Sequence, residues 1–291
     1  MVTLRKVLAS DYDDIVNIAE GIWDGSDYMP NVFKQWVNDP EGVFICAVDT
    51  VKNKVVGTGK LSILYDGSGW LEGFRVHKDY RGQKIGRKIA EYRIDFAKTL
   101  YQQKKINKLA LATHLCNVES VSLISKLNFK LKSAYYVFWK EPQNIDHNNF
   151  KSELKDFEFT NWECSYDEFI NLDYIKRRSG LIDLGYVFQQ PTLKLYQEIK
   201  NSNGFVSING YKGIFKIKGD AYFIAIDETF EAINTFTNYY LLKLKDGPAN
   251  SPTTSLTEMD ASLIENFNKE KYTSWSNWQP DYFYYVYDGD M

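Results

Sequence analysis

The sequence predicts a mixed α/β protein, with an α+β arrangement around a mixed sheet, organised as two lobes. Segments of alternating apolar and polar residues, typical of strands, are interleaved with segments whose apolar residues recur at helical spacing. The clearest strand-to-helix passage covers residues 70–100. A length of 291 residues is comfortable for two domains, which we place at residues 1–145 and 146–291.

Composition narrows the class of protein. Hydrophobic residues make up 44% of the chain and charged residues 25%, as in folded globular proteins. A formal net charge of −3 argues against nucleic acid as the main partner, and no apolar run reaches membrane-spanning length. The three histidines and three cysteines lack metal-ligand spacing, so we expect no metal. The odd cysteine count, without a signal-peptide pattern, favours the cytoplasm.

The first half of the chain reads in the order β-α-α-β-β-β-α-β-α-β. Ser10 and Asp13 resemble a capping box that opens the first helix, and turn residues at 24–30 separate it from a short helix carrying Trp36. The longest helix has an apolar stripe at Ile85, Ile89, Tyr92, Phe96 and Leu100. The expected strands are Val2–Val7, Val43–Val48, Val55–Leu64, Leu71–Val76, Leu109–Thr113 and Phe129–Trp139.

The second half repeats much of this order, as α-α-β-β-β-α-β-α-β. Helices are expected after the caps Ser165 and Thr192, over Glu228–Phe236, and from Ser255 to Phe267. The expected strands are Gly204–Asn209, Lys212–Lys218, Ala221–Ile226, Tyr239–Leu244 and Tyr282–Tyr287. An unrelated α+β domain is the alternative for this half.

The turn at residues 81–86 links the predicted strand Leu71–Val76 to the longest helix. A short glycine-containing turn into a helix points unpaired backbone N–H groups and the positive end of the helix dipole at one place. Such a place stabilises a phosphate or pyrophosphate. The alternative is an ordinary β-turn-α corner whose basic residues are solvated.

This turn resembles the cofactor motif of the GNAT superfamily of N-acetyltransferases, written Q/R-x-x-G-x-G/A. Arg81 and Gly86 match the ends of the motif, whereas Lys84 stands at its first glycine and must accept a conformation that glycine usually supplies. Residues 117–129 also look like the N-x-x-A/S-x-x-L-Y-x-K-x-G-F segment of the family. The resemblance covers residues 1–140 and implies a GNAT fold.

A narrower likeness involves the segment from Ile22 to Pro30, Trp36, and the stretch from Glu72 to Val76. It is similar to the histidine N-acetyltransferase-like branch of the superfamily. The second half would then be a degenerate GNAT-like lobe. Its corresponding junction, residues 226–229, has no glycine and two carboxylates, so we expect no cofactor there.

The resemblance implies that acetyl-CoA is the co-substrate. Backbone groups of the fourth strand would line its pantetheine, the turn would hold its pyrophosphate, and Asn117 would contact the pantetheine arm. The expected cofactor-binding residues are Phe74, Arg75, Val76, Arg81, Gly82, Gln83, Lys84, Ile85, Gly86, Arg87 and Asn117. A solvated helix face is the alternative reading for each of the basic residues.

Two residues are the expected catalytic groups. Glu72 on the fourth strand would act as the base that removes a proton from the attacking amine, unless it has a structural role. Tyr28 is expected to face the acceptor pocket, or else to pack on Trp36. The position of the family's acidic tyrosine holds Ile124, which cannot donate a proton.

Other groups could replace that acid, or the thiolate could leave with little assistance. The candidates for the acid are Tyr28, Tyr135 and Tyr136, with His114 as a relay unless it is an exposed loop residue. Cys116 reads as a small buried filler. Arg75 is a candidate partner for a carboxylate on the acceptor.

These expectations give an N-acetyltransferase that acts on a primary amine of a small molecule, such as histidine. Peptide, protein or aminoglycoside-type amines are the alternative acceptors. A catalytically silent acyl-CoA-binding regulatory protein is the alternative from another class, favoured by Ile124 and Lys84. The second lobe could form a homodimer or cover the acceptor site, and residues 275–282 offer aromatic side chains for either role.

Overall fold

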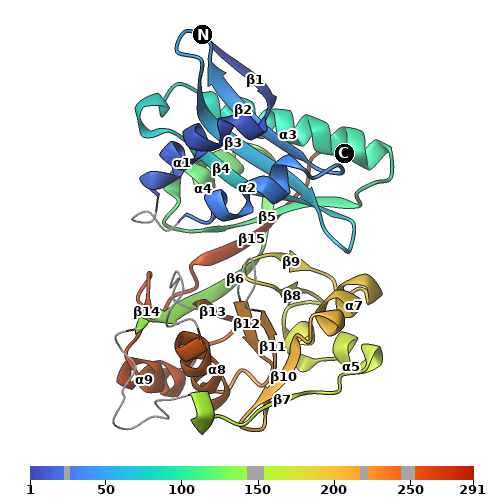
Figure 1. Cartoon of the computed structure of the whole chain (residues 1–291), viewed down its shortest axis with the longest axis vertical. Helices are drawn as coiled ribbons and strands as arrows, with labels where there is room; N and C mark the ends of the chain where they lie inside the picture. The colour runs from blue at the N-terminus through green and yellow to red at the C-terminus, as the bar shows by residue number, and fades with distance from the viewer. Residues whose placement is uncertain (23–26, 143–153, 217–221, 244–252) are drawn as a thin grey trace. The chain divides into compact units, whose positions relative to one another are not determined.

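The computed structural model describes residues 1–22, 27–142, 154–216, 222–243 and 253–291 (Figure 1). Contacts between Cα atoms divide the chain into two compact units. The first unit consists of Met1–Leu111, Glu119–Lys130 and Tyr285–Met291, and the second of Ala112–Val118 and Leu131–Tyr284. The last residues of the chain thus belong to the first unit, while a domain boundary at residue 145 stays a prediction.

The first unit is built on a mixed sheet with the strand order β1-β2-β3-β4-β5. Strands β1 to β4 are antiparallel neighbours, and β5 is parallel to β4. The strands are β1 (Val2–Lys6), β2 (Val43–Asp49), β3 (Lys54–Ile63), β4 (Ser68–Val76) and β5 (Lys108–His114). The helices are α1 (Tyr12–Glu20), α2 (Met29–Val37), α3 (Ile85–Gln102) and α4 (Val118–Ile124). The predicted order of these elements is confirmed.

Helices cover both faces of this sheet. As a result, β2 is buried along its whole length. Val43, Ile45 and Ala47 join the apolar cluster of α3, whereas Phe44, Cys46 and Val48 join that of α1 and α2. Successive side chains of a strand point to opposite faces, so one apolar strand supplies both cores. Burial on both faces also explains why β2 reads as a continuous apolar run.

Strand β4 departs from regular pairing on both of its edges. Against β3, Arg75 pairs with Thr58 and Glu72 with Lys60, so one extra residue of β4 forms a bulge. Gly73 lies in this bulge with φ +59°, and a Cβ there would come within 2.4 Å of the Trp36 ring. Against β5, the pairing covers only residues 68–70. The backbone of β4 beyond Trp70 therefore diverges from β5.

The second unit contains an antiparallel sheet with the order β12-β11-β10-β7. Separately, β13 and β14 pair with β6. The strands that lie wholly or partly in this unit are β6 (Phe129–Lys140), β7 (Phe159–Asn161), β8 (Ile182–Asp183), β9 (Phe188–Gln189), β10 (Phe205–Ile208), β11 (Tyr211–Lys216), β12 (Tyr222–Ala225), β13 (Thr253–Leu256), β14 (Tyr272–Ser274) and β15 (Tyr282–Tyr287). The helices are α5 (Tyr166–Ile170), α6 (Asp173–Arg177), α7 (Leu193–Asn201), α8 (Phe230–Lys243) and α9 (Ala261–Lys269).

Two of the helix starts predicted for the second unit are correct, and a third is not. The hydroxyls of Ser165 and Thr192 accept backbone N–H groups at the starts of α5 and α7, as predicted. The helix predicted to open at Ser255 is wrong at its start, because Ser255 lies in β13. Asp260 is the actual N-cap, and its carboxylate accepts the N–H of Leu263. The helix therefore begins six residues later than predicted, at Ala261.

Two further predictions are wrong. Residues 239–243 belong to α8 and not to a strand. The helix was missed there because α8 is buried on nearly all sides, so its sequence has no polar face to mark the helical period. Residue 244 lies outside the described residues. The capping box at Ser10 is also absent: α1 begins at Tyr12, and the Asp11 carboxylate accepts the N–H of Leu8.

Candidate active site

The turn before α3 has the conformation that a backbone anion site requires. Lys84 lies in the left-handed region at φ +60° and Gly82 at φ +76°, as the sequence predicts for Lys84. Lys84 is the N-cap of α3, and its side chain makes no capping hydrogen bond. The first N–H groups of an 18-residue helix therefore face the turn without a side-chain cap.

The glycine at position 86 allows α3 to approach β4 closely. A Cβ on Gly86 would lie 2.9 Å from Cζ of Phe74 and 3.6 Å from Val76. The side chain of Ile85 is buried in the core of the first unit, so only its backbone can face the turn. Helix start and strand thus form one packed surface, and the predicted residues Phe74, Val76 and Gly86 meet there.

Three exposed polar side chains at the turn and in the first turn of α3 have partners within the protein. Arg81 Nε donates to the carbonyl of Val76 at 3.4 Å, and Gln83 Nε2 donates to the carbonyl of Asp79 at 3.3 Å. Arg87 forms an ion pair with Glu91 one helical turn further on, at 2.7 Å. An anion at the turn would therefore compete with Glu91 for Arg87.

Glu72 lies on β4 beside the bulge. Its Oε1 accepts a hydrogen bond from Ser62 Oγ at 2.5 Å, and its backbone carbonyl accepts one from Arg93 Nη1 at 3.2 Å. Arg93 is almost completely buried, and burial lowers its pKa to about 10, although the charge of Glu72 opposes this. Glu72 is therefore a half-buried carboxylate with a hydroxyl donor, which is compatible with a base or with a structural residue.

Tyr28 and Arg75 come together beside the same bulge. The ring of Tyr28 packs edge-on against Trp36, with the ring centroids 5.9 Å apart, so the predicted packing is present. Burial raises the pKa of the Tyr28 hydroxyl, while Arg75 opposes the rise. Arg75 pairs with Asp27, which the sequence analysis did not single out because nothing marks one acidic residue in a turn as the partner of a distant strand.

The remaining predicted residues have other surroundings. Ile124 is a core residue of the first unit. In the second unit, Asn117 Nδ2 donates to Thr113 Oγ1 at 3.3 Å, and Tyr135 is buried against Phe188. His114 is not an exposed loop residue: it is 6% exposed, and its Nε2 lies 3.3 Å from Asp281 Oδ2.

Cys116 and Tyr136 complete the list of candidates. Cys116 is exposed and is therefore no buried filler, because it lies on the segment that follows β5. Tyr136 lies on β6 and pairs with Leu256 of β13. Neither observation gives these two side chains a chemical role.

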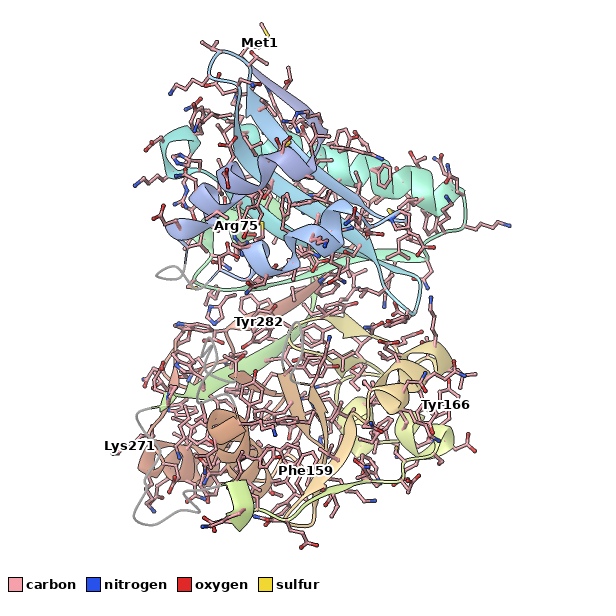
Figure 2. The ribbon with its side chains drawn as sticks, in the orientation of Figure 1. Met1, Arg75, Phe159, Tyr166, Lys271 and Tyr282 are labelled. Atoms are coloured by element: carbon pink, nitrogen blue, oxygen red, sulfur yellow. The ribbon has the colours of Figure 1, made fainter. Side chains whose placement is uncertain are left out.

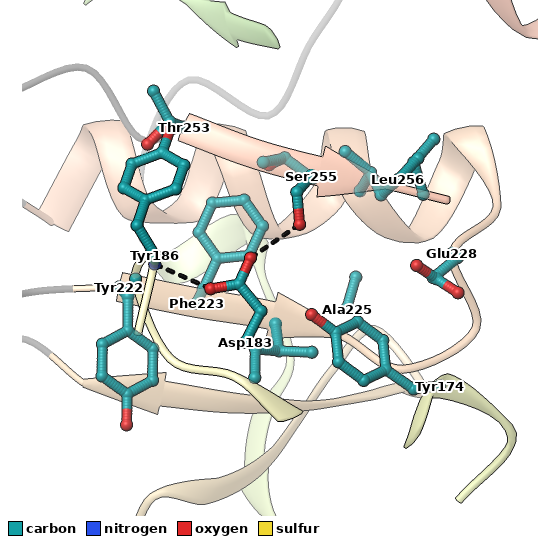
Figure 3. Close-up of a pocket in the computed structure, with 14 residues that line it drawn as sticks. Tyr174, Asp183, Tyr186, Tyr222, Phe223, Ala225, Glu228, Thr253, Ser255 and Leu256 are labelled. Carbon is teal, nitrogen blue, oxygen red and sulfur yellow. Dashed lines mark hydrogen bonds between the residues drawn. The ribbon is translucent and has the colours of Figure 1, made fainter. Parts of the chain in front are cut away.

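The second unit contains a small cavity of about 30 Å³ beside β12 and β13 (Figure 3). One wall carries Asp183, whose carboxylate accepts hydrogen bonds from Ser255 Oγ and from the N–H of Tyr186 at 2.7 Å each. Burial raises the pKa of Asp183. A cavity of this size holds a few water molecules at most.

Glu228 lies at the turn before α8, at φ +53°, and also lines this cavity. Its two carboxylate oxygens lie 2.6 Å from Arg177 Nε and 2.6 Å from Arg178 Nη2. Arg178 is buried, and its guanidinium lies over the Tyr174 ring at 3.6 Å. The junction at residues 226–229, predicted to be the counterpart of the turn at 81–86, thus places the Glu228 carboxylate against Arg177 and Arg178.

The described residues contain no group of three His, Cys, Asp or Glu side chains arranged to hold a metal ion. No helix in the described ranges is both long and apolar enough to cross a membrane.

Residues 8–129 match the model of the Acetyltransferase (GNAT) family. Two histidine N-acetyltransferases are similar in sequence: the protein of Xenopus tropicalis is 30% identical over 108 residues, 35% of this chain and 32% of that protein. The protein of Oreochromis niloticus is 27% identical over 100 residues, 34% of this chain and 29% of that protein. The chain spans about a third of the length of these relatives.

A GCN5-related N-acetyltransferase structure from Sphaerobacter thermophilus is similar over nearly the whole chain. Its TM-score is 0.60 at 8% identity, covering 98% of this chain and 95% of that one. This likeness concerns the fold alone. The family match covers residues 8–129, and the likeness of fold extends over nearly the whole mixed α/β chain.

Proposed function

We propose that the chain is an acetyl-CoA-dependent N-acetyltransferase that acetylates a primary amine of a small molecule, with the α-amine of histidine or a similar amino acid as the first acceptor to test. The observation that carries the proposal is the turn before α3. There, left-handed Lys84, uncapped helix N–H groups and close packing of Gly86 on Phe74 provide an anion cradle next to a diverging strand edge.

The residues present fit acetyl-CoA as the co-substrate, which supplies the acetyl group as a thioester when it is bound. The backbone of residues 82–87 would hold its pyrophosphate, and Lys84 and Arg81 would add positive charge. The β4 backbone beyond Trp70, from Phe74 to Val76, has an edge that β5 does not pair, which suits an extended amide-bearing chain. Asn117 remains a proposed contact of the pantetheine arm of acetyl-CoA.

Two residues beside the β4 bulge would carry out the proton transfers of the reaction. The amine must be neutral to attack, and Glu72 would accept its proton directly or through a water molecule. Tyr28 would give a proton to the departing thiolate, because a tyrosine hydroxyl is protonated at neutral pH. A backbone N–H at the bulge, where Gly73 lies, would stabilise the developing oxyanion.

The acceptor amine is a proposal that rests on the partial likeness to histidine N-acetyltransferases. Arg75, the predicted partner of an acceptor carboxylate, is paired with Asp27, so it would have to share its guanidinium with that carboxylate. An acceptor without a carboxylate would need no such sharing. Peptide, protein and aminoglycoside-type amines therefore remain acceptors to test.

A silent acyl-CoA-binding protein is the second candidate function. The observation in its favour is that Ile124, at the position of the family's acidic tyrosine, is buried in the core. Such a protein would bind acetyl-CoA through the same turn without transferring the acetyl group.

The experiment measures acetyl-CoA binding by calorimetry and thiol release against the twenty amino acids, polyamines, an aminoglycoside and a peptide. Glu72→Gln is the test variant, and Glu20→Gln, at the exposed end of α1, is its matched control. We expect turnover with one class of acceptor, lost in Glu72→Gln and kept in Glu20→Gln. Binding without turnover would support the silent protein, and absence of binding would overturn both functions.

A further inference from the structure

Asp27 is a buried carboxylate whose hydrogen-bonding capacity is largely used. Its side chain is 1% exposed, and it accepts hydrogen bonds from Arg75 Nε at 2.7 Å, Arg75 Nη2 at 3.2 Å and the N–H of Met29 at 3.1 Å. A bidentate ion pair with a guanidinium fixes the direction of the carboxylate as well as its distance. Asp27 thus attaches the start of α2 to β4, 48 residues further along the chain.

The fixed guanidinium in turn contacts Tyr28. The central carbon of the Arg75 guanidinium lies 5.7 Å from the centroid of the Tyr28 ring, and Nη1 donates to the carbonyl of Phe74 at 2.9 Å. Trp36 contacts the same Tyr28 ring edge-on. The ring is thereby held between a cation from β4 and an aromatic side chain from α2 (Figure 2 labels Arg75).

The same cluster holds the bulge of β4. Trp36 packs on the Cα of Gly73, and Thr58 Oγ1 donates to the carbonyl of Gly73 at 3.0 Å. The backbone N–H of Gly73 acts on the Tyr28 hydroxyl and favours its ionised form. The position of the Tyr28 hydroxyl relative to the bulge therefore depends on the orientation of its ring.

We propose that Asp27 is a positioning residue for acetyl transfer: by fixing Arg75, it orients Tyr28 so that the tyrosine hydroxyl lies at the β4 bulge. The inference rests on the proposed function, since Tyr28 is the proton donor of that reaction. Asp27 itself touches neither reactant. Its effect on the reaction passes through Arg75 and Tyr28.

Replacing Asp27 by Asn keeps the size of the side chain and removes its charge. The charged groups that act on the Tyr28 hydroxyl are Arg75, Glu72 and Asp27, and the last two raise its pKa. Without the charge of Asp27, the cation of Arg75 is less compensated, and the Tyr28 pKa falls. The Tyr28 hydroxyl should then titrate at lower pH in Asp27→Asn than in the wild type.

The experiment compares wild type, Asp27→Asn, Tyr28→Phe and the double variant with the best acceptor. We expect Asp27→Asn to lower kcat by roughly 10- to 100-fold, with little change in the KM for acetyl-CoA. We also expect the double variant to be no slower than Tyr28→Phe alone, because both changes act on the same group. A double variant that shows the product of the two losses would overturn the proposal.

Asp11→Asn is the matched control. Asp11 lies in the same unit, forms a bidentate ion pair with Arg5 and accepts the backbone N–H of Leu8. It should lose stability without changing kcat or its pH profile. Equal effects of Asp11→Asn and Asp27→Asn would show that Asp27 is structural only.

A readout without turnover separates this proposal from the proposed function. The Cζ resonance of Tyr28 in protein labelled at the tyrosine ring is identified by its absence in Tyr28→Phe. It should shift in Asp27→Asn and stay in place in Asp11→Asn. An unchanged resonance would overturn the positioning role even in a protein that acetylates no acceptor. A shifted resonance without turnover would contradict the proposed function and leave the link from Asp27 to Tyr28 standing.

Discussion

A methyl group on Gly86 would lie 2.9 Å from Cζ of Phe74, closer than side-chain carbons approach one another in folded proteins. The start of α3 therefore lies as near to β4 as a glycine permits. Because both the turn and the strand are proposed to contact acetyl-CoA, their spacing should determine how well the site fits this molecule.

Gly86→Ala should weaken acetyl-CoA binding by roughly tenfold, since either α3 or the Phe74 ring must move. Gly21→Ala is the control, because a Cβ on Gly21 meets nothing within 4 Å. Calorimetric titration with acetyl-CoA measures the effect. Equal affinities of the two variants would show that the packing of Gly86 does not shape the site.

Lys84→Gly should stabilise the fold while weakening cofactor binding. A residue other than glycine in the left-handed region costs about 1 kcal/mol, so removing the side chain should raise the free energy of unfolding by up to that amount. Acetyl-CoA affinity should fall a few-fold, because one cation beside the pyrophosphate is lost.

Lys104→Gly is its matched control, as Lys104 has φ +58° at the other end of α3. Urea unfolding should show a similar gain in both variants, and only Lys84→Gly should lose affinity. A loss of affinity in both variants would indicate a general change in α3 rather than a contact of Lys84.

The ion pair of Lys60 and Asp39 predicts a stability that depends on pH. Lys60 is fully buried, and Asp39 is its partner. Burial of Asp39 acts to raise its pKa, but hydrogen bonds from Lys60, Glu41 and Gly42 outweigh it and hold the pKa below the ordinary 3.8. A lowered folded-state pKa stabilises the protein above pH 3.8, and this stabilisation is lost as the pH falls through the folded value.

Asp39→Asn should therefore cost about 3 kcal/mol at pH 7, because it leaves the buried ammonium of Lys60 without its counter-charge. The cost should shrink toward pH 3. Urea unfolding of both proteins at the two pH values measures it, with the exposed pair Glu265–Lys269 as control through Glu265→Gln. A difference that is the same at both pH values would contradict the assignment.

Local patterns predicted the first unit well, because its determinants are close in sequence. The alternation in β4, the turn at 81–86 and the apolar stripe of α3 all lie within one stretch. The left-handed conformation of Lys84 was expected from the resemblance of this turn to the family motif, in which a glycine stands at that place. Helix α8 was partly misassigned because burial on nearly all sides removes the amphipathic period on which such predictions depend.

The tertiary pairs of the site were beyond local patterns. Asp27 meets Arg75, and His114 meets Asp281, only after the chain has folded, and no spacing links the members of either pair. Tyr28 was found through a resemblance, whereas the carboxylate that fixes its neighbour carries no local signal. Burial of His114 was missed for the same reason, since it depends on Trp275 and Asp281 near the other end of the chain.

The reactivity of the three cysteine thiols tests the arrangement around His114, because Cys116 lies close to it. Burial raises the pKa of Cys46 and of Cys164 to about 12 each, and both side chains are buried. Cys116 is exposed, although neighbouring atoms partly shield its thiol from water, and this partial desolvation and the charge of Asp281 both raise its pKa. Native protein treated with iodoacetamide at pH 8 should therefore be alkylated at Cys116 first.

Asp281→Asn should make that alkylation faster, on the order of a few-fold, because the thiolate of Cys116 no longer faces the charge of Asp281. Mass spectrometry of the native protein over time gives the rate and the site. Asp183→Asn is the control, as Asp183 is likewise a buried carboxylate of the second unit but is not among the groups that shift the Cys116 pKa. Thermal melting of both variants must show a folded protein at the temperature of the reaction. If alkylation is equally fast with and without the Asp281 charge, that carboxylate does not act on Cys116, and the described arrangement of His114, Cys116 and Asp281 is wrong.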